Sequence, residues 1–177
     1  ALDLPPVGAD LVVEKRSDKP EYTEDDDSVT YYLAVTNNGL GNAANVRLTD
    51  EISELQNSVG NKVFTDWTIE GVEVDDTGAV IQRHSFPSSK DLDTTVNLKS
   101  QKRNAYAFEV VGTLGKGLDD DITNTFTATE SDGTETSDSV TNHIKKIPDN
   151  SGELELTKSA LQDTAQVGDA VEYEIIV

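Results

Sequence analysis

The chain has 177 residues and a formal net charge of −20, from 14 basic and 34 acidic side chains. A field of that sign repels nucleic acid and anionic lipid, so neither is an expected partner. The sequence contains no cysteine and no methionine, which excludes disulfides, thiolate metal sites and thiol catalysis. No stretch is long and apolar enough to span a bilayer, so direct membrane insertion is not expected.

Two stretches of the chain are alike and indicate a tandem repeat. Residues 11–35 carry LVVEKRSDKP and DSVTYYLAV, and residues 154–177 carry LELTKSALQD and DAVEYEIIV. Aligning Lys15 with Lys158 gives a repeat of roughly 143 residues. We therefore expect one complete module and the truncated start of a second copy, an organisation more typical of spacers, adhesin stalks and fibres than of enzymes.

Turn-rich segments bracket the complete module. Residues 1–9 contain two prolines and a glycine, and we interpret them as a linker or the end of a preceding module. The module itself is expected over 10–147. A second linker is expected over 148–153, and the first strands of the next repeat over 154–177.

Alternation of apolar and polar residues with a period of two predicts the strands of the module. In chain order they are expected near residues 11–15, 29–35, 46–50, 65–72, 79–85, 94–98, 104–114, 122–128 and 139–145. Phe64 and Trp67 are expected in the core, with an exposed aromatic platform as the alternative. Short strands separated by turns such as NNGLGN and SDGT predict an all-β, immunoglobulin-like two-sheet sandwich with Greek-key connections.

Three polar residues fall on apolar strand faces. Lys15, Asp50 and Asn124 each lie in phase with the apolar residues of their strands, and Lys158 repeats the pattern in the second copy. Burial drives a lysine towards its neutral amine and an aspartate towards its protonated acid. A neutral Lys15 amine can attack the side-chain carbonyl of Asn124 while Asp50 polarises that carbonyl, which releases ammonia and forms an isopeptide bond.

Other interpretations of the same pattern remain open. Lys15 and Asp50 can form a buried ion pair that binds Asn124 without any reaction. Lys15 can also sit at a strand end and reach solvent. Asn142 is a rival acceptor, because it lies in phase with the apolar residues of the last strand.

Two acidic runs are candidate Ca²⁺ ligands at module junctions, because hard cations prefer oxygen ligands. They are Glu24, Asp25, Asp26 and Asp27, and Asp119, Asp120 and Asp121. Neither has EF-hand spacing and both fall where turns are expected, so solvated loops are the alternative. No other cofactor is indicated. His84 and His143 fit no metal or triad spacing, and the sequence indicates no enzyme.

Three segments resemble the DUF11 repeat family of prokaryotic surface proteins: DLVVEKRSDKP, DSVTYYLAVTNNGLGNAANVRLTDEIS and ITNTFTATESDGTETSDSV. That family has a Lys-bearing first strand, a V-T-Y-x-x-x-V-T-N-x-G second strand, an A-x-N-V-x-x-x-D third strand and a late N-T-A-T-like strand. Phe126 replaces a usual small residue, and the L-P turn expected after Asp50 is missing. The order of Lys, Asp and Asn is similar to that of self-crosslinked domains of Gram-positive adhesins and pilins.

The resemblance covers nearly all of 10–147 and implies a structural module that builds length. We therefore expect an extracellular, cell-surface module of an adhesin, stalk or filament that extends and bears load. Its partners would be neighbouring repeats or identical subunits. The strands of the second copy can bind such a subunit by adding to the edge of its sheet, which is strand donation. The alternative is a binding module that recognises a glycan, a host protein or Ca²⁺ through loops or acidic edges.

Overall fold

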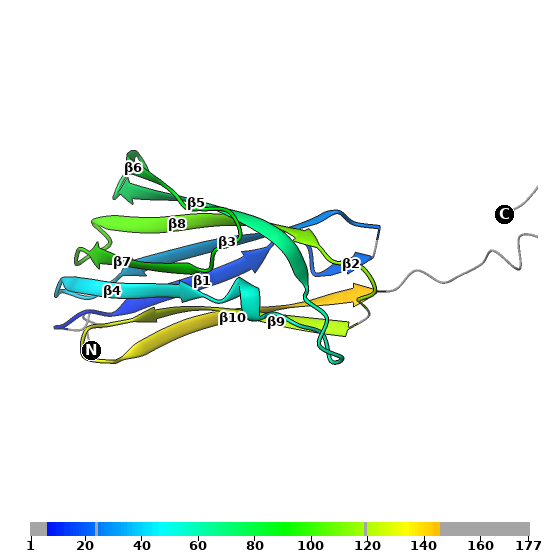
Figure 1. Cartoon of the computed structure of the whole chain (residues 1–177). Coiled ribbons are helices and arrows are strands. Elements are labelled where there is room, and N and C mark those ends of the chain that lie inside the picture. Colours follow the sequence, from blue (N-terminus) through cyan, green and yellow to red (C-terminus); the bar gives the residue numbers. More distant parts are fainter. Residues whose placement is uncertain (1–6, 24, 119, 146–177) are drawn as a thin grey trace, which may run out of the picture. The chain divides into compact units, whose positions relative to one another are not determined.

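The computed structural model describes residues 7–23, 25–118 and 120–145 (Figure 1). All of them fall in the first of the two units into which the chain divides, residues 1–146. The expected linker over 148–153 and the second repeat over 154–177, with Lys158, lie outside the described residues.

Ten strands and one short 3₁₀ turn, η1 (Ile52–Glu54), form across the described residues. The strands are β1 (Leu11–Ser17), β2 (Glu21–Thr23), β3 (Ser28–Asn37), β4 (Ala43–Asp50), β5 (Phe64–Asp75), β6 (Val80–Ser85), β7 (Leu92–Leu98), β8 (Asn104–Leu114), β9 (Asp120–Thr129) and β10 (Glu135–Lys145). Each of the nine predicted strands is present, most of them longer than predicted, whereas β2 was not predicted.

The strands form two five-stranded sheets. Sheet A has the order β1-β3-β8-β5-β6 and sheet B the order β2-β10-β9-β4-β7. The chain passes from one sheet to the other at every connection between these strands except the β5–β6 and β9–β10 hairpins, so strands that are neighbours in sequence often face each other across the core (Figure 1). The expected immunoglobulin-like β-sandwich is confirmed.

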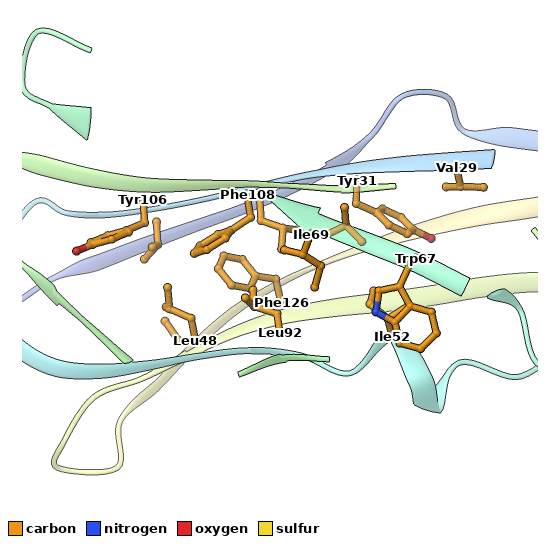
Figure 2. Close-up of a cluster of buried hydrophobic side chains, with 14 of the residues drawn as sticks. Val29, Tyr31, Leu48, Ile52, Trp67, Ile69, Leu92, Tyr106, Phe108 and Phe126 are labelled. Atoms are coloured by element: carbon orange, nitrogen blue, oxygen red, sulfur yellow. The ribbon is translucent and has the colours of Figure 1, made fainter. Parts of the chain in front are cut away.

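The core fills the space between the two sheets (Figure 2). Strand β3 shows how alternation builds it, because every second residue from Val29 to Val35 is fully buried while those between them are half-exposed. Phe108 of sheet A and Phe126 of sheet B meet edge to face, with ring centroids 6.3 Å apart. Phe64 and Trp67 are buried, which confirms the core interpretation of both.

Asn37, the last residue of β3 and part of the TNNG segment, fixes the point where the chain enters the module. Its Oδ1 accepts hydrogen bonds from the backbone N–H groups of Asp10 (2.9 Å) and Gly39 (3.0 Å), and its Nδ2 donates to the carbonyl of Gly41 (2.7 Å). A Cβ at position 39 would lie 2.1 Å from the carbonyl oxygen of Gly8. The Asn-x-Gly pattern therefore clamps residues 8–10 against the loop between β3 and β4.

Replacing Asn37 by alanine is expected to lower the free energy of unfolding by about 2–4 kcal/mol, because several buried backbone groups lose their partner at once. The adjacent Asn38→Ala is the matched control, since Asn38 Oδ1 has no hydrogen-bond partner. Urea unfolding of the two variants measures the difference. Equal losses in both would show that the clamp contributes nothing particular.

Candidate crosslinking site

The structure brings the predicted Lys15, Asp50 and Asn124 together inside the sandwich. They come from β1 of sheet A and from β4 and β9 of sheet B, and their exposed fractions are 4%, 1% and 2%. The Lys15 ammonium reaches across the core and forms an ion pair with Asp50 Oδ2, in which neither side chain contacts solvent. The alternative in which Lys15 reaches solvent is therefore wrong.

Strand β1 is an edge strand of sheet A, and polar contacts fasten it to sheet B. The backbone N–H of Lys15 donates to Asp138 Oδ2 of β10 at 2.8 Å. That contact occupies a main-chain group on an edge that would otherwise be open to another strand. Lys15 therefore binds sheet B twice, through its side chain and through its backbone.

Burial shifts both charged groups of the pair towards their neutral forms. It lowers the pKa of Lys15, although the carboxylates of Asp50 and Asp138 oppose the shift. It raises the pKa of Asp50 to about 6, against the opposing effect of Lys15. A neutral amine beside a protonated acid is the state that amide formation requires.

Asn124 lies beside the same carboxyl. Burial raises the pKa of Asp50 and that of the Tyr31 hydroxyl, and the Asn124 side chain partly opposes both shifts, so its amide lies near both groups. However, Asn124 Nδ2 makes no hydrogen bond of normal geometry, and neither does Asp50 Oδ1. A buried amide nitrogen without a good partner is unfavourable, and in the crosslinking reaction this is the atom that leaves as ammonia.

Tyr31 of β3 is a member of the site that the sequence did not reveal. The Lys15 ammonium lies 4.4 Å from the centroid of its ring, and its hydroxyl donates to Asn142 Oδ1 at 3.1 Å. Burial raises the pKa of this hydroxyl, so it stays protonated. Because tyrosine commonly fills apolar strand positions, its place in the alternation gave no sign of a polar role.

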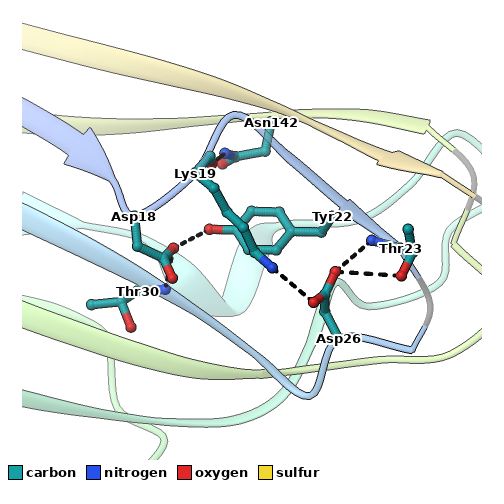
Figure 3. A network of polar contacts seen from close by, with 7 residues as sticks. All are labelled: Asp18, Lys19, Tyr22, Thr23, Asp26, Thr30 and Asn142. Carbon is teal, nitrogen blue, oxygen red and sulfur yellow. Dashed lines mark hydrogen bonds and ion pairs between the residues drawn. The ribbon is translucent and has the colours of Figure 1, made fainter.

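Asn142, the rival acceptor, is buried but has a different environment. Its Nδ2 donates to Ser17 Oγ and to the carbonyl of Lys19, both at 2.9 Å, and its Oδ1 accepts from Tyr31. Asn142 therefore anchors the segment that leaves β1, where Lys19 joins a polar network around Tyr22 (Figure 3). Its amide nitrogen is bonded twice, in contrast to that of Asn124.

The first acidic run lies in the segment between β2 and β3. Asp26 accepts hydrogen bonds from Lys19 Nζ and from the Thr23 backbone, both at 2.7 Å (Figure 3). Asp25 and Asp27 are exposed, and Glu24 lies outside the described residues.

The second acidic run was predicted in a turn, but Asp120 and Asp121 begin β9, so that prediction is wrong for these two residues. Asp120 accepts from the Ser58 backbone at 2.7 Å, and Asp121 pairs with His143 at 2.5 Å. Asp119 lies outside the described residues. Within the described part of the chain, no group of three or more His, Asp or Glu side chains is placed to hold a metal ion, and Ca²⁺ stays a prediction.

None of the described segments forms a helix long and apolar enough to cross a membrane. No protein-family model matches the chain. No curated protein matches it either.

Solved structures with a similar strand arrangement include proteins of different kinds. The CARDB domain of a Pyrococcus furiosus protein, solved with di-metal ions, is 11% identical, with 81% of this chain and 94% of that chain covered and a TM-score of 0.44. The Bacillus cereus major pilin subunit BcpA is 11% identical over 76% of this chain and 40% of the pilin, with a TM-score of 0.43. A family 123 glycoside hydrolase from Clostridium perfringens is 11% identical over 77% of this chain and 27% of the hydrolase, with a TM-score of 0.49.

This chain thus spans less than half of the pilin and about a quarter of the hydrolase. At such low identities none of these proteins assigns a function to it.

The variant N124A, which lacks the predicted acceptor, isolates the titration of Asp50. The folded state keeps this proton up to about pH 6, whereas the ordinary pKa is 3.8. The folded state therefore binds more protons between these values, and the stability that this group contributes is lost as pH rises through about 6.

We expect the free energy of unfolding of N124A to fall by about 2 kcal/mol between pH 4 and pH 7, relative to the double variant D50N/N124A. Urea unfolding at both pH values measures this difference, and the paired comparison removes the effect of all other carboxylates. A difference between the two variants that does not change with pH would contradict the raised pKa.

Proposed function

We propose that the chain is a structural module of an extracellular, cell-surface adhesin, stalk or filament, braced by a self-formed isopeptide bond between Lys15 and Asn124. The observation that supports it is the convergence of Lys15 and Asn124 on the buried carboxyl of Asp50. The protein carries out no catalysis beyond this one internal reaction.

The reaction needs no external reagent. The lone pair of the neutral Lys15 Nζ attacks Asn124 Cγ while protonated Asp50 donates its proton to Asn124 Oδ1. Asp50 then takes a proton from the attacking nitrogen and delivers it to Nδ2. The Cγ–Nδ2 bond breaks and ammonia leaves, Oδ1 returns its proton to Asp50 as the carbonyl re-forms, and an amide joins the two side chains. Asp50 ends protonated, as it began.

The bond would join the two sheets through strands that are far apart in sequence. Lys15 and Asn124 are separated by 109 positions, so the crosslink closes a long loop in the unfolded chain. By the chain-entropy relation used for disulfides, a loop of that length contributes about 4–5 kcal/mol of stability. A chain without cysteine would thereby acquire the robustness that secreted proteins commonly gain from disulfides.

The environments of the two asparagines favour Asn124 as the acceptor. Asn142 Nδ2 is held by two hydrogen bonds that would have to break before ammonia could leave. Asn124 Nδ2 has none of normal geometry, and its side chain approaches the carboxyl that contacts Lys15.

Membership of the DUF11 family is part of the same proposal. Two of the motif positions have clear physical roles, because Asn37 and Gly39 form the clamp on residues 8–10. Lys15, Asp50 and Asn124, which stand at the Lys, Asp and Asn positions of the motifs, form the candidate crosslinking site. The partners we propose are neighbouring repeats or identical subunits. Strand donation by 154–177 would be one such contact, and it lies outside the described residues.

A groove on the outer face of sheet A favours the binding-module alternative. Its floor is formed by small side chains, including Ala34 and Ala107, which are paired in register across β3 and β8. Tyr32 lines the groove and carries Arg16 over its ring at 5.0 Å. Glutamate and arginine side chains also line the groove, and their donors and acceptors beside an aromatic ring suit the hydroxyl groups of a glycan. It lies on a sheet face and not on the loops or acidic edges where binding was expected.

The crosslink is tested by the intact mass of the purified chain. We expect the wild type to be short by one ammonia, and Lys15→Ala and Asn124→Ala to have their full calculated masses. Asp50→Ala is expected to have its full mass as well, because the proton shuttle is lost. Asn142→Ala is the matched control and should retain the loss.

Tryptic digestion followed by fragment mass analysis would identify the two joined residues. A wild type of full mass would refute the crosslink. Loss of ammonia in N124A but not in N142A would move the bond to Asn142, and loss in D50A would refute the role of the acid.

A further inference from the structure

The outward faces of the two sheets differ in character. On sheet B, the central strands β9 and β10 turn hydroxyl side chains outward: Thr123, Thr125, Thr127, Thr129, Ser137, Ser139 and Thr141. On sheet A, aliphatic side chains point outward on all five strands. An antiparallel sheet whose outer face meets only water is normally polar on that face, as sheet B is. The outer face of sheet A therefore has the composition of an interaction surface.

The ladders of sheet A align its outward residues in three rows, each of which crosses the strands in the order β1, β3, β8, β5, β6. Row 1 is Val12, Thr36, Ala105, Val74 and Val80. Row 2 is Glu14, Ala34, Ala107, Val72 and Arg83. Row 3 is Arg16, Tyr32, Glu109, Glu70 and Ser85. Row 1 is uncharged, and Val12 and Val80 at its ends are 44% and 48% exposed.

Row 2 has aliphatic side chains at its centre and opposite charges at its ends. The Glu14 carboxylate lies on β1, at one edge of the sheet, and the Arg83 guanidinium lies on β6, at the other edge. Both side chains are exposed. Four spacings between strands separate them, which is about 19 Å between their backbones, so they cannot pair within one module. A row that is acidic at one end and basic at the other can bind a reversed copy of itself.

A second copy of the module can present that reversed row. In a face-to-face pair with a two-fold axis along the middle strand, β8, each row lies over the same row of the second copy in the opposite order. Glu14 of each copy then faces Arg83 of the other, which gives two equivalent ion pairs. In row 1, Val12 of each copy faces Val80 of the other. Charge thus meets opposite charge in row 2, and apolar surface meets apolar surface in row 1.

Row 3 contains one favourable and one unfavourable contact. Arg16 of each copy faces Ser85 of the other, and the Ser85 hydroxyl donates to Glu70 Oε1 at 3.0 Å, so a carboxylate lies beside the incoming guanidinium. Glu109 lies on β8, so it faces Glu109 of the second copy across the axis. Further carboxylates lie outside the three rows, towards the ends of the strands: Asp10, Asp66 and Asp76. Rows 1 and 2 therefore favour the pair, whereas Glu109 opposes it.

The face has the size that a specific contact needs. The ten residues of β3 extend over about 34 Å and five strands over about 24 Å, which gives an area of about 800 Å². That is the area each partner contributes to a specific interface of ordinary size. The small side chains of Ala34 and Ala107 at the centre of row 2 also let two such sheets approach closely.

We propose that two copies of this module associate face to face through the outer surface of sheet A, about a two-fold axis along β8. The proposal deepens the proposed function and rests on it, because it names the surface through which identical subunits meet. It does not require the Lys15–Asn124 bond. The groove that suits a glycan lies within the same face, so a second copy and a glycan exclude each other there.

Sedimentation velocity of the full chain over a series of concentrations tests the association. Salt at about 0.15 M shortens the Debye length to about 8 Å, which screens the long-range repulsion between two acidic chains. We expect the wild type to dimerise reversibly. The variants E14R and R83E each create two contacts between like charges across the axis, so the Kd of the dimer should rise by about tenfold or more.

The combination of the two variants is the decisive measurement. An equimolar mixture of E14R and R83E should form mixed dimers about as tightly as the wild type does, because the facing charges are opposite again. The double variant E14R/R83E should dimerise for the same reason. The matched controls E135R and K99E make the same changes of charge at exposed positions outside this face and should behave as the wild type. E109Q should dimerise more tightly than the wild type.

A wild type that stays monomeric at every concentration would overturn the proposal and leave the face to a ligand such as a glycan. Dimers that E14R and R83E do not weaken would place the association in another part of the chain and overturn it as well. Failure of the mixture to dimerise, or weaker dimers of E109Q, would contradict the two-fold axis along β8. Intact mass on the same samples reports the crosslink separately, so a failure of association is distinguished from a failure of isopeptide formation.

Discussion

The burial of Lys15 against Asp50 is the contact on which the rest of the account depends. Removing two charged groups from water is strongly unfavourable unless each finds a partner or becomes neutral. Here the partners come from different sheets, so the contact forms only when the sandwich is closed. The same desolvation shifts both groups towards their neutral forms and gives an otherwise inert pair the character of a nucleophile and an acid.

The position of β1 makes this contact important when the module is under a pulling force. An edge strand at the start of a module is the first element that a pulling force would peel away. In this protein β1 is held to sheet A by its ladder with β3, and to sheet B by the Lys15 side chain and by Asp138. Asn142 holds the residues that follow β1. A covalent bond at Lys15 would replace its ion pair with Asp50 by a link that a pulling force cannot separate as it separates hydrogen bonds and ion pairs.

Much of the fold could be predicted because the chain alternates clearly where one strand face is buried. Strand β2 escaped prediction because three residues are too few to show a period, and its parallel pairing with β10 is a long-range feature. Asp120 looked like a turn residue because of its composition, yet the ladder between β9 and β10 extends through it. The left-handed residues Gln101 and Lys102 carry no sequence signal, because the loop that contacts them imposes their conformation.

The candidate site was predictable for the same reason, since Lys15, Asp50 and Asn124 interrupt apolar faces. The choice between Asn124 and Asn142 could not be predicted, because both fit the alternation and only their hydrogen-bond partners differ.

The most direct test of the central claim is to stretch single molecules from their two ends. The wild type should release about 390 Å less length on unfolding than Lys15→Ala, because the 109 positions between the joined residues stay closed at about 3.6 Å each. Equal lengths from the two proteins would contradict a covalent brace.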